Sequence, residues 1–544
     1  MAEFLHFSRD SRLYMEKDGR LWSIPVLDGF SFSQATNASE ITLNEMEDAS
    51  GRSRRGRKMF TDSLSAAEWS FSSYVRPFKS AGSKSYSNGL ADATATHQHA
   101  VEEALWVAMA GQNVYVPATG KFKHGATGGA LTSLVVASGG TDSDRTAATY
   151  TVAIPTAASG TSVGAVVSTG TGSNTDGTNA VLSVVIDGSG VATISITERG
   201  TQFDTGNTIT VGSELIGSAA GDDNLVLTAT SESYTSDATD LDINFYDSNR
   251  AALGTFDLYY VFSDRSDGRL LYKLENAVVN EAAIDFDIDG IATINWSGMA
   301  GQIKEVITGL GAGQITAATT APTATAAGAL WADTDDSDKL YISTASGDSN
   351  WYANISEGST STGNFIRNRL TNLTLAPEGT LTTGFRGTTT FDREGDGVGG
   401  DKYREDYSVA ITGGNVTISN NISYLTPEEL GKVNQPIEHV TGTRSVTGSL
   451  TCYLASSDAA TNRSKNLFQD LVSDVTTVIN KFAITLQVGG TDTTKPRFEI
   501  SLPLAHLEIP SHSIEDVISL ETNFHGLGSG VGEGDEVTLK YIGV

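Results

Sequence analysis

Cysteine is almost absent from this chain of 544 residues. A single cysteine, Cys452, excludes an intrachain disulfide framework and any cysteine-rich metal site. In the stretch TCYL it alternates with Leu450 and Leu454, which is the pattern of one buried strand face. We therefore predict that Cys452 is a buried strand thiol rather than a nucleophile.

Proline and long apolar runs are scarce as well. Eleven prolines are too few for a disordered linker protein. No run approaches the roughly 18 apolar residues of a membrane-spanning helix. The opening residues, MAEFLHFSRD, lack the basic flank and apolar centre of a secretory signal. Synthesis in a cytoplasm is therefore expected, with no membrane segment.

Basic residues are outnumbered by acidic ones. The chain has 36 Lys and Arg against 65 Asp and Glu, a formal net charge of −29. Such a surface favours solubility and repels nucleic acid rather than binding its phosphates.

Patterns for catalysis or metal binding are weak. DREGDGVGGDKY, Asp392 to Tyr403, starts like an EF-hand calcium loop but ends in Tyr403 instead of the bidentate glutamate, which favours a hairpin tip. DTDDSD, Asp333 to Asp338, is interpreted as an acidic turn. His97 and His99 lack zinc partners at suitable spacing and are interpreted as polar residues at a helix start. No phosphate loop, nucleophile elbow or triad pattern appears. We expect no enzyme, no metal site and no cofactor.

Short runs rich in Val, Ile and Thr, separated by Gly, Asp, Asn and Ser, make up most of the sequence. Such runs predict a mainly β protein. Because 544 residues exceed what one core organises, two to four domains are expected.

One of these domains is written twice. FDLYYVF, Phe256 to Phe262, aligns with FAITLQV, Phe482 to Val488, at an offset of 226 positions. Both place an apolar residue at every second position, as a strand with one buried face does. Continued through the next strand without a gap, the alignment sets Leu274 against Ile500.

The correspondence extends in both directions. HAVEEALWVAMAG, His99 to Gly111, and TNRSKNLFQDLVSDV, Thr461 to Val475, are predicted amphipathic helices. Upstream, EWSFSSYVRPF resembles TGSLTCYLASS, and FSFSQATN resembles VTISNNIS; downstream, NWSGM resembles NFHGL. Matched apolar residues are predicted core anchors of the two copies: Phe71, Trp106 and Trp296 in the first, Leu450, Phe468 and Phe524 in the second.

Two segments interrupt the copies. The first, 124–235, is rich in Gly, Ser and Thr, carries only Arg145 and Arg199 as cations, and is predicted to be an inserted β-sandwich. The second, Thr319 to Tyr352, resembles a β-hairpin module of phage tail and fibre proteins through GALWADT, KLY and a closing Trp351. The expected domains are 1–123 with 236–310, the insert 124–235, a linker with the hairpin module at 311–360, and 361–544.

One basic stretch stands out in the acidic chain. GRSRRGRK lies in the long segment between the first strands of copy one and contains Arg52, Arg54, Arg55, Arg57 and Lys58. No aromatic residues for base stacking are interleaved, which disfavours nucleic acid. We predict that it docks on acidic surface of a neighbouring copy; a solvated loop and nucleic-acid binding are the alternatives.

Together these features resemble the tail tube proteins of long-tailed bacteriophages. The residues that carry the resemblance are FSFSQATN, the basic loop, EWSFSSYVRPF, the helix at His99 and DFDIDGIATINWSGMAG, with their counterparts in the second copy. The resemblance implies β-sandwich or barrel domains, each with one flanking helix and a long loop that reaches the adjacent ring. Such tubes are stacks of six-domain rings, so two domains per chain imply homotrimeric rings.

The implied role is a structural virion protein, made in the host cytoplasm, whose tube conducts DNA from capsid to host. Stacking would use the long loops, with the arginine cluster meeting carboxylates such as Glu428 and Glu429. The implied partners are further copies, the tail tip, a terminator and a sheath, with passing DNA that is not specifically bound. The insert is a candidate for weak host-surface or glycan contact. A tail-tip or baseplate hub protein with the same domain, and a secreted β-rich adhesin, are the alternatives.

Overall fold

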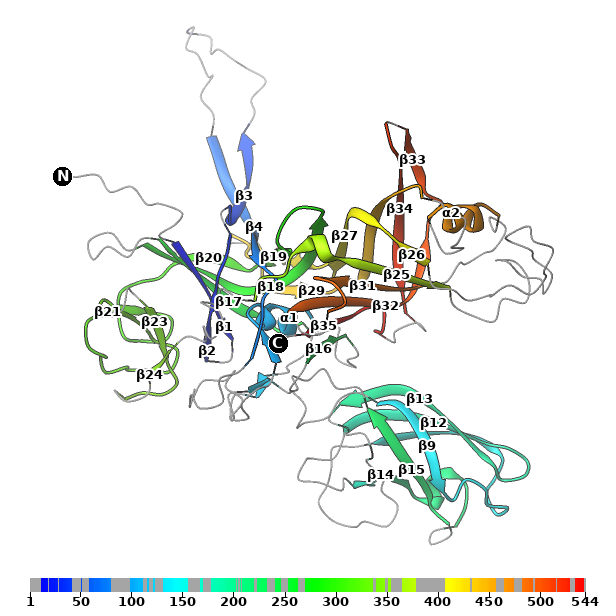
Figure 1. The fold of residues 1–544 in the computed structure, drawn as a ribbon. Coiled ribbons are helices and arrows are strands. Elements are labelled where there is room, and N and C mark those ends of the chain that lie inside the picture. The colour runs from blue at the N-terminus through cyan, green and yellow to red at the C-terminus, as the bar shows by residue number, and fades with distance from the viewer. Residues whose placement is uncertain are drawn as a thin grey trace.

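One antiparallel sheet, built by strands from both halves of the sequence, dominates the computed structural model of this chain (Figure 1). The structure describes residues 11–17, 19–27, 29–41, 50, 58–79, 98–110, 115–116, 121–122, 131–154, 167–169, 178–201, 203, 206, 208–219, 223–231, 240–245, 253–262, 270–335, 339–347, 351–353, 364–377, 407–430, 433–455, 464–473, 482–492, 495–514, 516–528 and 534–542.

The central sheet, here called the long sheet, has each strand paired with the next in antiparallel fashion. Its first and second halves meet at the pair β18–β27, where Asp285 lies opposite Asn415. The strands in spatial order are β3 (Ser31–Ile41), β4 (Lys58–Tyr74), β19 (Thr293–Ala300), β18 (Leu270–Asp287), β27 (Ile411–Ser419), β30 (Ser445–Tyr453), β34 (Ile518–Leu527) and β33 (Ser511–Ile514).

A second layer of strands covers the apolar face of the long sheet. In the first half, β17 pairs with β18 and with β1, and β20 pairs with the opposite edge of β18. In the second half, β32 and β31 hold the places of β18 and β17. These strands are β1 (Ser11–Lys17), β2 (Arg20–Ile24), β17 (Phe256–Phe262), β20 (Gln302–Glu305), β25 (Asn372–Pro377), β26 (Tyr407–Val409), β31 (Phe482–Val488), β32 (Arg497–Leu507), β35 (Thr538–Ile542) and β16 (Asp240–Asn244).

The same pairing order occurs twice along the chain. The order β2–β1–β17–β18–β19–β4–β3 is matched strand by strand by β26–β25–β31–β32–β34–β30–β27. Leu13 and Met15 of β1 are fully buried, as are Leu373 and Leu375 of β25. Sequence comparison found the shared strands from β3 onward but missed the pairs β1–β25 and β2–β26.

The strand registers correct the sequence alignment by two residues in two places. Leu258 lies opposite Leu274, and the equivalent Ile484 lies opposite Leu502, so Leu502 rather than Ile500 matches Leu274. The second hairpin turn is two residues longer. In the first half, two additional residues lie instead at the bend of β18, beside Asn276, whose φ is 54°. The two halves are therefore in register again after the bend.

The second correction concerns β4 and β30. Phe71 lies opposite Trp296, whereas Gly448 lies opposite Phe524. Because Trp296 and Phe524 occupy equivalent positions, Phe71 matches Gly448 and not Leu450.

The helices are shorter than predicted. They are α1 (Glu103–Ala110) and α2 (Ser464–Ser473), with the 3₁₀ turns η2 (Ser213–Ile216) and η3 (Asn368–Leu370). His99 lies before α1 in β6 (Gln98–Ala100), which pairs with β5 (Pro77–Lys79). It is buried, with its Nδ1 2.9 Å from Glu103 Oε2. The interpretation of His99 as a polar residue at a helix start is therefore wrong, while His97 lies outside the described residues.

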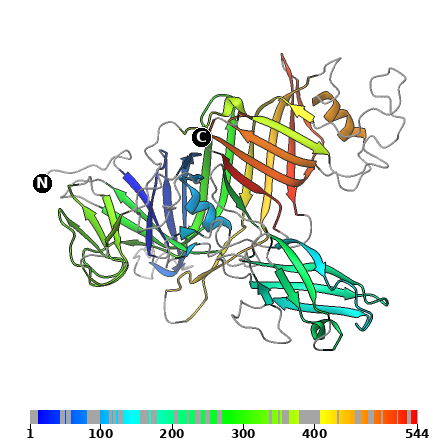
Figure 2. The same cartoon turned by 60° about the horizontal axis from the view of Figure 1, so that its bottom comes forward.

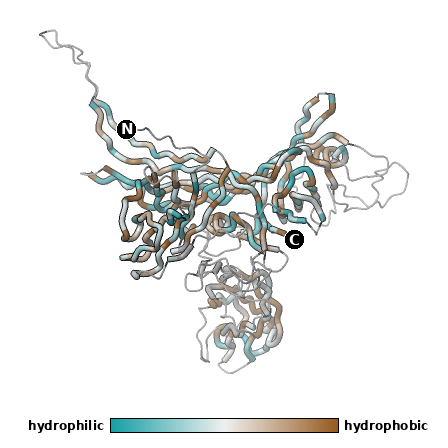
Figure 3. The backbone as a smooth tube through the Cα atoms, turned by 60° about the vertical axis from the view of Figure 1, so that its left-hand side comes forward, coloured by the Kyte–Doolittle hydropathy of each residue, from teal (hydrophilic) through white to brown (hydrophobic). Residues whose placement is uncertain are grey.

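The inserted segment forms its own pair of sheets, which lie away from the body of the molecule (Figures 2 and 3). Its core contains no residue of the long sheet among those described, and Leu182 is fully buried in it. Arg145 ties two loops together by donating to the carbonyls of Gly139 and Asp223 at 2.7 and 2.8 Å. The strands are β9 (Leu131–Ser138), β10 (Ala148–Ile154), β11 (Val167–Thr169), β12 (Thr178–Ile186), β13 (Ala192–Thr201), β14 (Thr208–Val211) and β15 (Leu225–Ser231), preceded by the pair β7 (Tyr115–Val116) and β8 (Lys121–Phe122).

The hairpin module is a separate sheet that packs on the outer layer of the first half. Its apolar side shares a cluster with Tyr14, Leu21 and Tyr259. Trp331 donates to the Ala318 carbonyl at 2.9 Å and stacks on Tyr341. The strands are β21 (Ile315–Ala318), β22 (Leu330–Asp333), β23 (Lys339–Ser343) and β24 (Trp351–Ala353).

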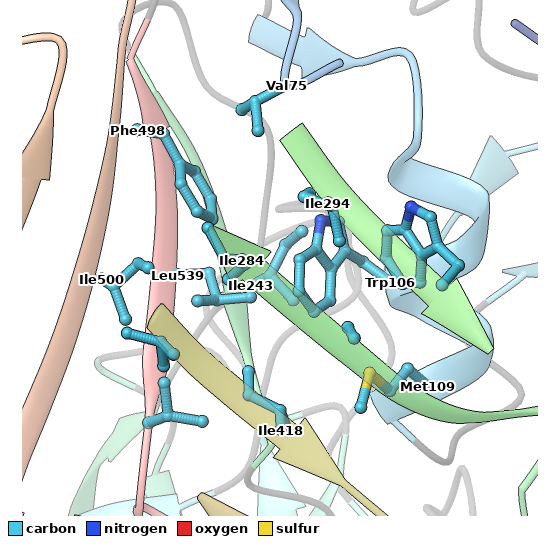
Figure 4. Close-up of a cluster of buried hydrophobic side chains, with 14 of the residues drawn as sticks. Val75, Trp106, Met109, Ile243, Ile284, Ile294, Ile418, Phe498, Ile500 and Leu539 are labelled. Carbon is cyan, nitrogen blue, oxygen red and sulfur yellow. The ribbon is translucent and has the colours of Figure 1, made fainter. Parts of the chain in front are cut away.

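The main core is continuous between the two halves. Figure 4 shows Ile284, Ile294 and Trp106 from the first half converging with side chains of the second half, Ile418, Phe498 and Leu539. Cys452 belongs to the same cluster, and burial raises the pKa of its thiol to about 11. The predictions of a mainly β fold and of a buried strand thiol are confirmed.

Candidate functional site

The side chains that alternate with core residues along the long sheet form one broad surface, here called the polar face. Strand pleating puts every second residue on this side. In β30, for example, Val446, Leu450 and Cys452 are buried while Thr447 and Ser449 are not. The polar face comprises Ser31, Ser33, Glu68, Ser70, Ser72, Tyr74, Glu281, Ala283, Asp285, Asp287, Thr293, Asn295, Ser297, Asn415, Thr417, Ser419, Ser445, Thr447, Ser449, Thr451, Tyr453, His506, Ser511, Ser513, Ser519, Glu521, Asn523 and His525.

The charge of the polar face has one sign. Its carboxylates are Glu68, Glu281, Asp285, Asp287 and Glu521, spread over both halves of the sheet. Among its residues, all of which the structure describes, none is Lys or Arg. Most of the others are Ser, Thr and Asn, short side chains that hydrogen-bond water without carrying charge.

In the first half, cross-strand hydrogen bonds connect the polar face. Ser72 Oγ on β4 donates to Asn295 Oδ1 on β19 at 2.6 Å, and Asn295 Nδ2 donates to Asp285 Oδ2 on β18 at 2.6 Å. The hydroxyls of Ser31 and Ser70 are 2.9 Å apart between β3 and β4. These bonds fix the rotamers of short side chains along the sheet.

The second half repeats this arrangement near its outer edge. Asn523 Nδ2 donates to Glu508 Oε2 at 2.9 Å, and His525 Nε2 lies 3.3 Å from Glu508 Oε1. The hydrogen bond from Asn523, followed by that from His525, holds the pKa of Glu508 below its ordinary value. Glu508 therefore keeps its negative charge, and the imidazole of His525 is engaged with it, while His506 lies opposite His525 on the same face.

This surface is suited to repelling rather than binding polyanions. Fixed carboxylates disfavour phosphate, and no described Lys or Arg on this face offers it a partner. Within the described residues, no group of three or more His, Cys, Asp or Glu is placed to hold a metal ion.

The predicted core anchors lie beneath the polar face. Phe71, Trp296, Leu450 and Phe524 are at most 3% exposed. Trp296 meets Trp106 of α1 edge to face, with ring centroids 4.7 Å apart. The remaining predicted anchor, Phe468 on α2, is only partly buried against the core.

The predicted stacking residues are only partly described. Arg52, Arg54, Arg55 and Arg57 lie outside the described residues. Lys58 begins β4, is exposed, and has its Nζ 5.2 Å from the centroid of the Phe60 ring. Figure 1 shows β3 and β4 rising from the body as an arm.

Glu428 and Glu429 are exposed in the loop between β28 (Ser423–Leu425) and β29 (Glu438–Val440). The same loop reaches the base of the arm. The amide of Leu64 donates to the Asn434 carbonyl at 2.9 Å, and the amide of Asn434 donates to the Asp62 carbonyl at 3.0 Å. This contact between β4 of the first half and a loop of the second half has no signal in the sequence, because backbone groups carry it.

The remaining predicted features are outside this surface. The EF-hand-like stretch 392–403 lies outside the described residues. Asp333 and Asp335 form a turn in which the Asp335 amide donates to Asp333 Oδ1 at 3.4 Å. None of the helices described has the length and apolar character needed to cross a bilayer.

Comparison with known proteins gives one clear relationship. No protein-family model matches the chain. The sequence is 23% identical over 519 residues to a protein named tail tube protein pb6 of Escherichia phage T5. The match covers 95% of this chain and 70% of the relative, so it includes both halves and the segments between them. The resemblance to phage tail tube proteins is therefore confirmed, and the chain is a homologue of a tail tube protein along almost its whole length.

Proposed function

We propose that this chain is the structural subunit of a phage tail tube, that three copies close a ring, and that the polar face lines the lumen through which DNA passes. The support comes from the long sheet. It joins two equivalent halves edge to edge through β18 and β27, and it carries on one side a polar surface without Lys or Arg.

The ring follows from the joint inside the chain. β18 of the first half pairs with β27 of the second, and this contact is heterologous because two different edges meet. Repeating a heterologous contact generates either a closed ring or a filament. The two outer strands of the long sheet are β3 and β33. β3 is the equivalent of β27, and β33 is the equivalent of the end of β18. Pairing them between chains closes the sheet into one barrel and removes its open edges.

The lumen assignment rests on chemistry. Double-stranded DNA presents phosphate along its whole length, and a cationic wall would bind it by releasing counterions. Carboxylates, hydroxyls and amides hold a hydration layer and leave the DNA free to slide.

The proposal includes the domain division predicted from the sequence. Segments 1–123 and 236–310 form the first tube domain, and 361–544 form the second. The insert 124–235 and the hairpin module within 311–360 decorate the tube. Weak contact of the insert with a host surface or glycan, and of the tube ends with tail-tip, terminator or sheath proteins, belongs to the same proposal.

Electron microscopy of purified protein tests the assembly. Rings with threefold symmetry, alone or stacked into tubes, are expected. An elongated monomer at every concentration, or a ring whose symmetry is not a multiple of three, contradicts the proposal.

Charge reversal tests the lumen. In phage particles, the triple variant Glu281→Lys, Asp285→Lys and Glu521→Lys should form tails of normal length yet lower infectivity at least tenfold, because DNA is retained in the tube. The control variant Asp144→Lys, Glu305→Lys and Asp335→Lys changes the charge equally at exposed residues away from the polar face. Equal infectivity of the two variants would place the lumen elsewhere.

A further inference from the structure

A short segment clasps the joint between the two halves of the chain. Residues 364–371 precede β25 and cross the tip of the β18–β19 hairpin. The Ala292 amide donates to the Ile366 carbonyl at 2.9 Å, and the Asn368 amide donates to the Gly290 carbonyl at 3.2 Å. Arg367 forms an isolated antiparallel β-bridge with Ile291 on the same tip. A segment of the second half thereby binds the end of a hairpin of the first half.

Two side chains anchor this clasp. Ile366 is 1% exposed and belongs to the main core. The Phe365 ring meets Tyr74 edge to face at 5.2 Å, and the Arg76 guanidinium lies 5.4 Å from its centroid. In addition, Arg369 Nη1 and Asp289 Oδ1 form an exposed ion pair at 3.5 Å. The anchors are apolar, and the charged pair at the rim contributes little to stability by itself.

The equivalent hairpin of the second half is β33–β34. Ser511 lies opposite Glu521 as Asp285 lies opposite Thr293, so its tip at 514–518 matches 288–290 and is two residues longer. Ile514, Val517 and Ile518 are 79%, 58% and 38% exposed at this tip. Within the described residues, no isolated bridge crosses it.

The registers of β1 and β25 identify the equivalent clasp. Leu13 lies opposite Tyr260 and Leu373 opposite Leu486, which fixes an offset of 360 positions between the two strands. Residues 364–370 therefore correspond to residues 4–10, which read FLHFSRD. Leu5 stands at the position of Phe365 and Arg9 at that of Arg369, whereas His6 stands at the position of the buried Ile366. Phe4 and Phe7 are further apolar side chains in the stretch.

We propose that residues 4–10 of one chain cross the tip of the β33–β34 hairpin of the next chain in the ring. The inference rests on the proposed ring and names the segment that locks it. A neighbour has to supply the segment because residues 4–10 lead directly into β1, and seven residues reach about 25 Å at most. β1 lies with the first half of the chain, on the opposite side of the molecule from β33 and β34 (Figure 1).

Paired cysteines test the contact in assembled protein. In a Cys452→Ala background, Leu5→Cys with Val517→Cys should give oxidised dimers and trimers on denaturing gels. The control pair, Leu5→Cys with Val135→Cys, uses an exposed site in the insert and should not. Equal cross-linking of both pairs, or none in either, overturns the inference.

Deletion of residues 2–10 separates the clasp from the tube itself. The truncated chain should keep its unfolding temperature yet lose at least tenfold in the yield of rings and tubes. Backbone amides of 511–518 should exchange faster in its remaining tubes than in full-length tubes. Tubes formed in full yield with unchanged exchange at this tip would overturn the clasp while leaving the tube function intact.

Discussion

The hydroxyl of Tyr541 donates a hydrogen bond to Glu102 Oε1 at 2.7 Å, although 439 positions separate the two residues. The same hydroxyl accepts a bond from Trp106 Nε1 at 2.6 Å. Glu102 precedes α1 in the first half, and Tyr541 lies on β35 of the second. This buried network, with Arg76, His99 and Glu103 nearby, fastens the halves together behind the long sheet.

Glu102 should make stability depend on pH. Burial raises its pKa to about 7, only partly offset by the hydrogen bond from Tyr541. Because the folded-state pKa lies above the unfolded one, the contribution is fully present below about pH 4.5 and is lost as pH rises through about 7. A shift of this size corresponds to roughly 3 kcal/mol. Glu102→Gln should flatten the fall in unfolding temperature between pH 5 and 8, whereas the exposed Glu428→Gln should not. Parallel pH profiles for all three proteins would contradict this role.

Trp296 should be costly to truncate. Its ring is fully buried against Trp106, and its Nε1 donates to Ser73 Oγ at 2.9 Å. Trp296→Ala should destabilise the body by about 3–5 kcal/mol, measured by chemical unfolding. Leu182→Ala, in the separate core of the insert, should lower only the transition of the insert and leave assembly unaffected. If either variant shifted the unfolding transitions of the body and of the insert together, the two cores would not be independent.

Gly298 should not tolerate a methyl group. A Cβ there would lie 2.0 Å from the Val278 carbonyl oxygen and 2.4 Å from the Trp69 ring. Gly298→Ala should therefore lower the unfolding temperature clearly. Gly290→Ala is the control, since its Cβ would meet nothing closer than Asn368 Nδ2 at 3.6 Å. Similar behaviour of the two variants would show that Trp69 and its strand yield easily.

Reversing the arginine cluster tests ring stacking. The variant Arg52→Glu, Arg54→Glu, Arg55→Glu and Arg57→Glu should shorten or abolish tubes at physiological salt, while its circular dichroism stays native. Individual surface pairs contribute little, but their repetition at every ring makes the sum large. Tubes of normal length from this variant would refute a docking role for the loop.

The sequence predicted which side of each strand is buried better than it predicted register. Alternation along TCYL placed Cys452 correctly because side-chain direction is a local property of a strand. The match of Phe71 to Leu450 was two residues off, because apolar residues recur every second position and slipping by two preserves the pattern. Only the cross-strand partners, Trp296 and Phe524, resolve that ambiguity.

Features that depend on distant contacts left no local signal. The sequence predicts a polar helix-start residue at His99, yet the side chain is buried in strand β6, where Glu103 contacts it. The polar face was not assigned from the sequence, since Ser, Thr and Asn on strands are common on any solvated sheet. Its meaning arises from the continuity of eight strands, which includes the joint β18–β27.

That joint has a consequence for the parity of the assembly. If each chain brings two fused domains, a closed ring contains an even number of domains, and half of its joints form without any encounter between molecules. Neighbouring domains are also free to diverge, because they are separate stretches of one gene. In such a ring only every second domain carries an insert. Each domain with an insert therefore has a domain without one on either side.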